Sequence, residues 1–294
     1  MAYTNVQPQR RGLFSNLANP VLRKMEKNAD YSSEETASYK GIVSKTVFFL
    51  VVTVIGAFLC FIVHNLLIAS TSADQIIHAA DAKNGIYNFS MAPAEAIIMI
   101  VVLAISLIVP FLAWFIRASV PVTGTIYCVA QGYLIGFITV ALAQEYKFIS
   151  FLAMIITLAL VAAMLFVYAK RIIKVTARFR GIITAIFIGI VLSGIIFFIL
   201  SIIPGIRNSM AYQGVASVMN NPAFSIILSI VFVIIAALFM LVDFDTIERC
   251  VENKMDKKYE WMAAWGLAYT ILYIYFKVLR ILLMIFGRGK SSRD

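Results

Sequence analysis

Residues 182–203 read IITAIFIGIVLSGIIFFILSII, a run without a charged residue or a histidine. An α-helix rises about 1.5 Å per residue, so roughly 20 apolar residues are enough to cross the hydrocarbon core of a bilayer. The same pattern recurs in other parts of the chain, without the period-two alternation of a barrel strand. The predicted spans are Thr46–Ala69, Ala94–Ile116, Val122–Ala143, Ile149–Ala169, Ile182–Ile203, Ala223–Val242 and Trp261–Phe286.

The composition agrees with a membrane protein. Hydrophobic residues make up 62% and charged residues 14% of the 294 residues, against about 45–50% and 25% in soluble domains. A soluble globule of this size could not bury so much apolar surface, which excludes soluble enzymes and free binding modules. The net charge is +10, and most of the charged residues lie between the apolar runs. We therefore expect the basic residues to set the orientation of the protein in the membrane and to contact anionic lipid headgroups, and we expect no nucleic-acid partner.

The chain divides into a polar, basic tail of residues 1–44, a seven-helix transmembrane domain of residues 45–286 and a short basic C-terminal tail of residues 287–294. With seven spans, most Lys and Arg residues of the connections fall on the side of the N-terminus, which predicts a cytoplasmic N-terminus. The basic C-terminus then lies outside if the last segment crosses the membrane, and inside if that segment re-enters. Crossing is the favoured reading.

Catalytic and metal-binding patterns are not found. Neither His64 nor His78 belongs to a paired zinc motif, no phosphate-binding glycine loop occurs, and the cysteines have neither disulfide nor metal spacing. We expect no enzyme activity, no cofactor and no bound metal. His64 lies inside the first span, either bonded to a neighbouring helix or acting in proton transfer. Gly132 and Gly136 form a GxxxG pattern, which indicates close helix packing.

Acidic residues close the sixth span, where charges are costly. Asp245 and Arg249 stand four residues apart and can pair on one helix face, whereas Asp243 and Asp245 point in different directions. Arg117, at the end of the second span, reaches the same depth and could contact an aspartate. The alternatives are that the acids only end the span and that Arg117 only anchors its helix.

Aromatic residues at a spacing of four mark the last span, ahead of Lys277. They trace one slowly drifting face of a helix, which fits an aromatic belt at a membrane interface. Lys277 can form a cation–π pair with the last aromatic residue or extend towards the membrane surface beside Arg280. The aromatic residues are Trp261, Trp265, Tyr269 and Tyr273.

These features resemble the Bax inhibitor-1/YccA-like membrane protein family along nearly the whole chain. The most specific match is DFDTIER at Asp243–Arg249, together with the last helix. Segments nearer the N-terminus resemble a bacterial branch of the family. The remaining matching segments are NPVL at Asn19–Leu22, Lys174–Thr176 with Phe179, YEWMAA at Tyr259–Ala264 and VLR at Val278–Arg280.

The resemblance implies an all-α, polytopic fold in which six helices surround a central seventh. It also implies a pH-sensitive calcium leak, with paired aspartates of the sixth and seventh helices as proton sensors and an arginine latch. By this resemblance Asp245 is the first aspartate and Arg117 the latch. Thr270 stands at the position of the second aspartate, and Gln131 replaces the glutamate of some relatives.

The chain's departures from the family pattern weaken the proton switch. Two carboxylates that share a site shift each other's titration strongly, and Thr270 cannot do this for Asp245. The switch should therefore be weaker, or be taken over by Asp243.

Two functions follow as expectations. The first is a pH-modulated cation leak in a bacterial inner membrane, gated by Asp245, with calcium as the cation. The second is a membrane interaction protein in quality control or stress survival, which binds a membrane-anchored protease through the tail of residues 1–44. An intramembrane enzyme is a third, weaker alternative.

Overall fold

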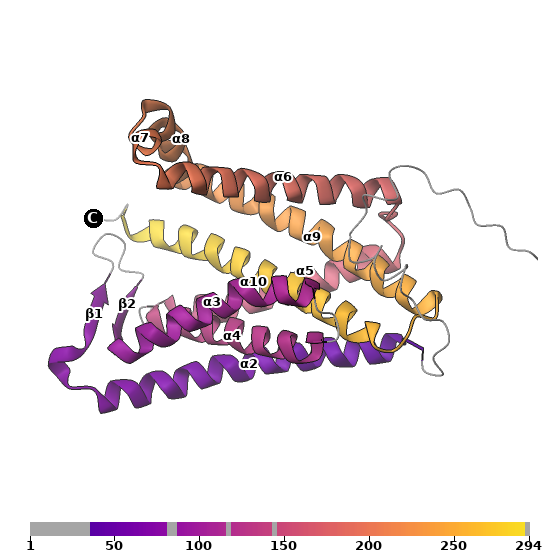
Figure 1. Cartoon of the computed structure of the whole chain (residues 1–294), viewed down its shortest axis with the longest axis horizontal. Coiled ribbons are helices and arrows are strands. Elements are labelled where there is room, and N and C mark those ends of the chain that lie inside the picture. Colours follow the sequence, from indigo (N-terminus) through magenta and orange to yellow (C-terminus); the bar gives the residue numbers. More distant parts are fainter. Residues whose placement is uncertain (1–35, 81–86, 116–118, 143–145, 292–294) are drawn as a thin grey trace, which may run out of the picture.

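The computed structural model describes residues 36–80, 87–115, 119–142 and 146–291 (Figure 1). Long helices dominate this part of the chain, and a two-stranded hairpin joins the first two. The elements, in chain order, are α2 (Tyr39–Ser70), η2 (Ala73–Gln75), β1 (Ile77–Ala80), β2 (Asn88–Met91), α3 (Pro93–Phe115), α4 (Val120–Ala141), α5 (Phe148–Ala169), α6 (Ala177–Ile202), α7 (Pro204–Arg207), α8 (Met210–Asn220), α9 (Pro222–Glu252) and α10 (Tyr259–Ser291).

Seven of the helices are long and apolar enough to cross a membrane, and each coincides with one predicted span. The prediction of an all-α, polytopic membrane protein is therefore confirmed. Several helices are longer than the apolar runs because polar caps extend them. The Ser38 side chain accepts a hydrogen bond from the backbone N–H of Gly41, so α2 begins at Tyr39, inside the predicted tail. At the other end, α9 continues ten residues beyond Val242 to Glu252.

The helix ends define two sides of the bundle (Figure 1). We call the side with β1 and β2 the hairpin side, which also holds α7, α8 and the end of α10. The opposite side holds the start of α2 and the turn between α9 and α10, which are joined by a bridge between Thr36 and Asp256. α10 is continuous and ends on the hairpin side, and it is long and apolar enough to cross a membrane, while the crossing itself stays a prediction.

The hairpin and the short helices α7 and α8 were not predicted. β1 and β2 pair antiparallel, with Ile77 opposite Met91 and Ala80 opposite Asn88. Four-residue strands give too short a pattern to be recognised from the sequence alone. α8 lies between the two spans α6 and α9, and the Tyr212 ring stacks on Phe197 of α6 with 4.9 Å between ring centroids.

Glycines allow α2 and α4 to approach backbone to backbone. A Cβ atom added to Gly132 would lie 2.0 Å from the carbonyl oxygen of Thr53, and one added to Gly136 would lie 2.6 Å from that of Ala57. From the other helix, a Cβ on Gly56 would lie 2.4 Å from the carbonyl oxygen of Val129. The GxxxG pattern therefore acts in packing, as predicted.

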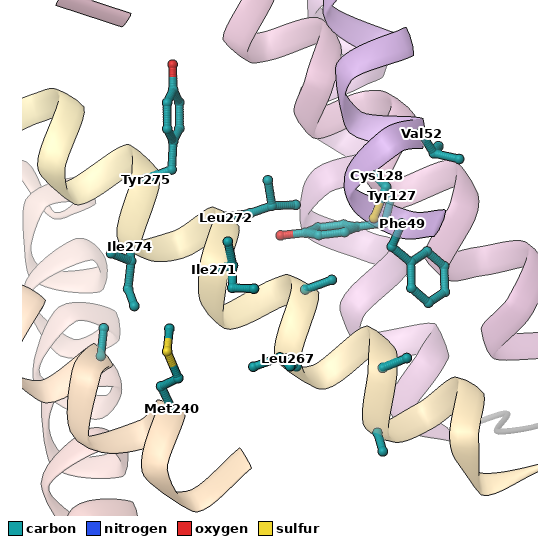
Figure 2. Packing of buried hydrophobic residues seen from close by; sticks show 14 of the residues in the cluster. Phe49, Val52, Tyr127, Cys128, Met240, Leu267, Ile271, Leu272, Ile274 and Tyr275 are labelled. Atoms are coloured by element: carbon teal, nitrogen blue, oxygen red, sulfur yellow. The ribbon is translucent and has the colours of Figure 1, made fainter. Parts of the chain in front are cut away.

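The main hydrophobic core forms around α10, which packs against α2, α4, α5 and α9 (Figure 2). In Figure 2, Leu267, Ile271 and Leu272 of α10 lie between Tyr127 of α4 and Met240 of α9. α10 thus contacts four of the other long helices, while the arrangement of all six around it stays a prediction. By contrast, only a small share of α6 is buried within the protein.

Candidate functional site

The acidic residues that were predicted to close the sixth span are still part of α9, because this helix continues to Glu252. Asp243, Asp245 and Glu248 lie in the last three turns of α9, on the side opposite the hairpin. Each carboxylate contacts a different neighbouring helix or connection. The divergence of Asp243 and Asp245 follows from their spacing of two residues, as predicted.

Asp245 is the centre of a buried ion-pair cluster. Its Oδ2 atom accepts a hydrogen bond from Nε of Arg249 at 2.9 Å and lies 3.3 Å from Nη1 of Arg180. The predicted contact between Asp245 and Arg249 is therefore present. Asp245 and Arg180 are 8% and 6% exposed, so this pair is shielded from water and joins α9 to the start of α6.

Arg180 was missed by the sequence analysis because it precedes the fifth span in a basic connection. Thr176 accepts a hydrogen bond from the backbone N–H of Phe179 and so starts α6 at Ala177, ahead of the apolar run. Arg180 then falls in the first turns of the helix rather than in a loop. Arg117, the predicted latch, lies outside the described residues, so its role stays a prediction.

Asp243 contacts Thr270 of α10. The Thr270 hydroxyl donates to Oδ2 of Asp243 at 2.6 Å, a shorter contact than the 3.2 Å to the carbonyl oxygen of Gly266. The family resemblance predicted Thr270 beside Asp245, but the Thr270 hydroxyl contacts Asp243 instead. Within the described ranges, no cationic side chain forms an ion pair with Asp243.

Glu248 joins α9 to the end of α5. The Tyr168 hydroxyl and Nη2 of Arg171 both donate to its carboxylate. Arg171 follows α5 with a positive φ of 54°, a conformation that ends the helix and turns its side chain back towards α9. The hydrogen bond to Glu248 and its negative charge raise the pKa of Arg171 above its usual value.

The two remaining predicted residues lie away from the aspartates. Gln131 is buried in α4, next to the glycine contact with α2. The Lys277 ammonium group lies 5.2 Å from the ring centroid of Tyr273, the predicted cation–π pair, and 4.3 Å from that of Phe232 on α9. Lys277 follows Thr270 by seven residues, about 10 Å along α10.

No group of three or more His, Cys, Asp or Glu side chains is arranged to hold a metal ion in the described part of the chain. The cluster is thus a set of ion pairs and hydrogen bonds between helices. It can bind or release protons, and it can present carboxylate oxygens to a passing cation.

Three comparisons relate the chain to known proteins. The chain matches the family model described as Bax inhibitor 1 like over residues 19–287. Neither the curated proteins nor the solved structures contain a match to it.

Proposed function

Because the chain belongs to the Bax inhibitor-1-like family, we propose that it is a cation leak pathway, with calcium as the cation, whose conduction responds to pH. The observation that carries the proposal is the buried carboxylate of Asp245, which ties α9 to α6 through Arg180. A single proton on this carboxylate removes the charge that holds both arginines.

In this proposal the latch is the ion pair between Asp245 and an arginine. Arg180 forms this pair in addition to the predicted Arg117. When Asp245 is ionised, Arg180 and Arg249 hold it in place and the start of α6 stays against α9. When Asp245 is protonated, both guanidinium groups lose their counter-charge, and for the buried Arg180 an unpaired charge is strongly unfavourable. Arg180 then moves towards water, and α6, which is little buried elsewhere, moves with it.

Asp243 supplies the site for a cation or a proton. Within the described residues the partner of Asp243 is a hydroxyl, and a carboxylate paired in this way is costly to keep ionised inside an apolar bundle. Binding of a cation or of a proton offsets this cost, and Thr270 keeps the carboxylate oriented in either case. The two carboxylates therefore have separate roles, with Asp245 holding the helices and Asp243 binding the cation or proton.

The orientation of the protein is part of the proposal. The α5–α6 connection on the side opposite the hairpin is rich in Lys and Arg, which supports a cytoplasmic location for that side and for the N-terminus. We place the protein in a bacterial inner membrane on the strength of the sequence resemblance. The basic residues of this connection and of the first turn of α6 are Lys170, Arg171, Lys174, Arg178 and Arg180.

Calcium flux into liposomes that contain the purified protein tests this function. We expect flux above that of empty liposomes, and a flux that differs between pH 6 and pH 8. Asp245→Asn should change the flux or its response to pH, because it removes the charge that pairs with Arg180 and Arg249. Asp243→Asn should reduce the flux at both values, because the cation loses its carboxylate.

Glu252→Gln is the matched control, since Glu252 is an exposed acid at the end of the same helix. It should leave the pH response unchanged. Folded protein without flux would contradict the proposal that the protein conducts cations. An unchanged pH profile in Asp245→Asn would show that Asp245 does not control the conduction.

The interaction-protein alternative stays a prediction, because the described residues begin at Thr36, near the end of the predicted contact tail. Deletion of residues 1–35 discriminates between the two functions. Loss of a co-purifying membrane-anchored protease with intact flux would favour interaction.

A further inference from the structure

A second buried pair of titratable residues joins α2 to α3 near the hairpin side. Glu95 lies in the first turn of α3 and is 0% exposed. The Nδ1 atom of His64 lies 3.0 Å from both of its carboxylate oxygens. One nitrogen that faces two carboxylate oxygens at this distance fits an N–H donor. His64 stands six residues before the end of α2, about 9 Å along the helix.

Two further titratable groups face this pair. Cys60 lies one turn before His64 on α2, and its side chain is fully buried. Tyr133 of α4 lies against Cys60 and near Glu95, and its buried hydroxyl has no nitrogen or oxygen partner within the described ranges. Strand β2, which also packs on α2 and α4, has the sequence NFSM and adds no titratable group.

The charge balance of the pair depends on one proton. An imidazolium and a carboxylate together carry no net charge, as do a neutral imidazole and a protonated carboxyl group. Loss of the single proton leaves one negative charge in an apolar cluster that includes Val102 and Ala130. A buried charge without a counter-charge is strongly unfavourable.

We propose that His64 and Glu95 form a proton-binding site that clamps α2 to α3 on the hairpin side, separate from the aspartates of α9. With its proton bound, the site is neutral and the two helices stay in contact. When the proton leaves, water must reach the Glu95 carboxylate, which requires α2 and α3 to separate. The clamp is therefore closed at lower pH and opens as the pH rises.

Cys60 gives a direct readout, because its buried side chain shares a cluster with Val102 of α3 as well as with Tyr133 of α4, and separation of α2 from α3 opens that cluster. The test uses the full chain with Cys128→Ala and Cys250→Ala, which leaves Cys60 as the single cysteine. The rate of alkylation by a maleimide is measured between pH 6 and pH 9. This rate is divided by the alkylation rate of the same protein in denaturing detergent. The ratio then no longer contains the pH dependence that comes from ionisation of the thiol itself.

The expected result is a ratio that rises with pH. Release of one proton on opening gives a limiting slope of about tenfold per pH unit. The matched control is the double variant His64→Gln/Glu95→Gln, in which two neutral amides can still hydrogen bond. This variant should give a low ratio that does not change with pH. For His64→Gln alone, the ratio should start to rise at lower pH than for the wild type, because Glu95 must then hold the proton without the imidazole.

A wild-type ratio that is independent of pH would overturn the proposal, as would a double variant that keeps the wild-type slope. The comparison of these two proteins is sufficient if the single variant does not fold. Asp245→Asn in the same single-cysteine chain should keep the slope, since it alters the other site. The readout does not involve ion flux, so it distinguishes failure of this clamp from failure of the proposed leak.

Discussion

The contact between α2 and α4 predicts that Gly132→Ala destabilises the protein. The added Cβ would lie 2.0 Å from the carbonyl oxygen of Thr53 and 3.0 Å from the backbone nitrogen of Ala57. Carbon–oxygen contacts between helices normally lie at about 3.3–3.6 Å, so the helices must separate by roughly 1.3 Å. Both atoms belong to backbone, which no change of rotamer can move.

Gly132→Ala has two opposing effects on the free energy of unfolding, a loss from overpacking and a gain from helix propensity. Overpacking costs about 1–3 kcal/mol, and a clash with backbone belongs at the upper end of that range. Replacing a helical glycine with alanine gains about 1 kcal/mol from helix propensity alone. We therefore expect a net loss of about 2 kcal/mol for Gly132→Ala, which corresponds to a decrease in Tm of about 4–8 °C.

Gly189→Ala is the matched control. Gly189 lies within the apolar run of α6, and a Cβ there would meet nothing within 4 Å. Thermal unfolding of both variants in the same detergent, followed by tryptophan fluorescence, gives the comparison. Equal or higher stability of Gly132→Ala relative to Gly189→Ala would refute the assignment of the GxxxG pattern to close packing.

Two further predictions concern the side opposite the hairpin. Glu260 is 1% exposed, accepts a hydrogen bond from the backbone N–H of Ser38 at 2.8 Å and forms an ion pair with Lys45. Glu260→Gln should lower the free energy of unfolding by about 2 kcal/mol, and the loss in Lys45→Met/Glu260→Gln should be smaller than the sum of the single losses; additive losses would contradict the pairing. Lys258 lowers the pKa of Asp256 below its usual 3.8 through a side-chain contact and a backbone N–H. The ionised carboxylate thus stabilises the fold above pH 3.8, and this contribution disappears as the pH falls through the lowered pKa. Asp256→Asn should therefore be less stable than the wild type at pH 7, by up to about 1 kcal/mol, and equal to it at pH values below the lowered pKa, as measured by thermal unfolding across pH; a difference that persists in acid would rule out the charge as its cause.

The spans could be predicted from the sequence because a bilayer imposes a length and a composition on each helix. The hairpin could not, since Ile77–Ala80 and Asn88–Met91 are too short to show a period. α8 did carry a signal. Tyr212, Val215 and Met219 fall on one face of an 11-residue helix, the pattern of a helix that lies in a membrane interface.

The candidate site was predictable where its contacts are local. Asp245 and Arg249 are one helical turn apart, so their pairing follows from helix geometry alone. That Thr270 meets Asp243 rather than Asp245 depends on the rotation of α9 against α10, which the sequence does not determine. Arg180 reaches Asp245 only because α6 begins at Ala177, before its apolar run.

The sparse burial of α6 has a consequence for the lipid around it. Its 26 residues extend about 39 Å, roughly 9 Å more than the hydrocarbon thickness of an average bilayer. A helix of this length must tilt or have its ends outside the hydrocarbon, and the thickness of the membrane sets the balance between the two. Arg180 fixes one end of α6 to α9. A thinner or thicker bilayer therefore pulls on that ion pair, so lipid chain length is a variable that every measurement on this protein should hold constant.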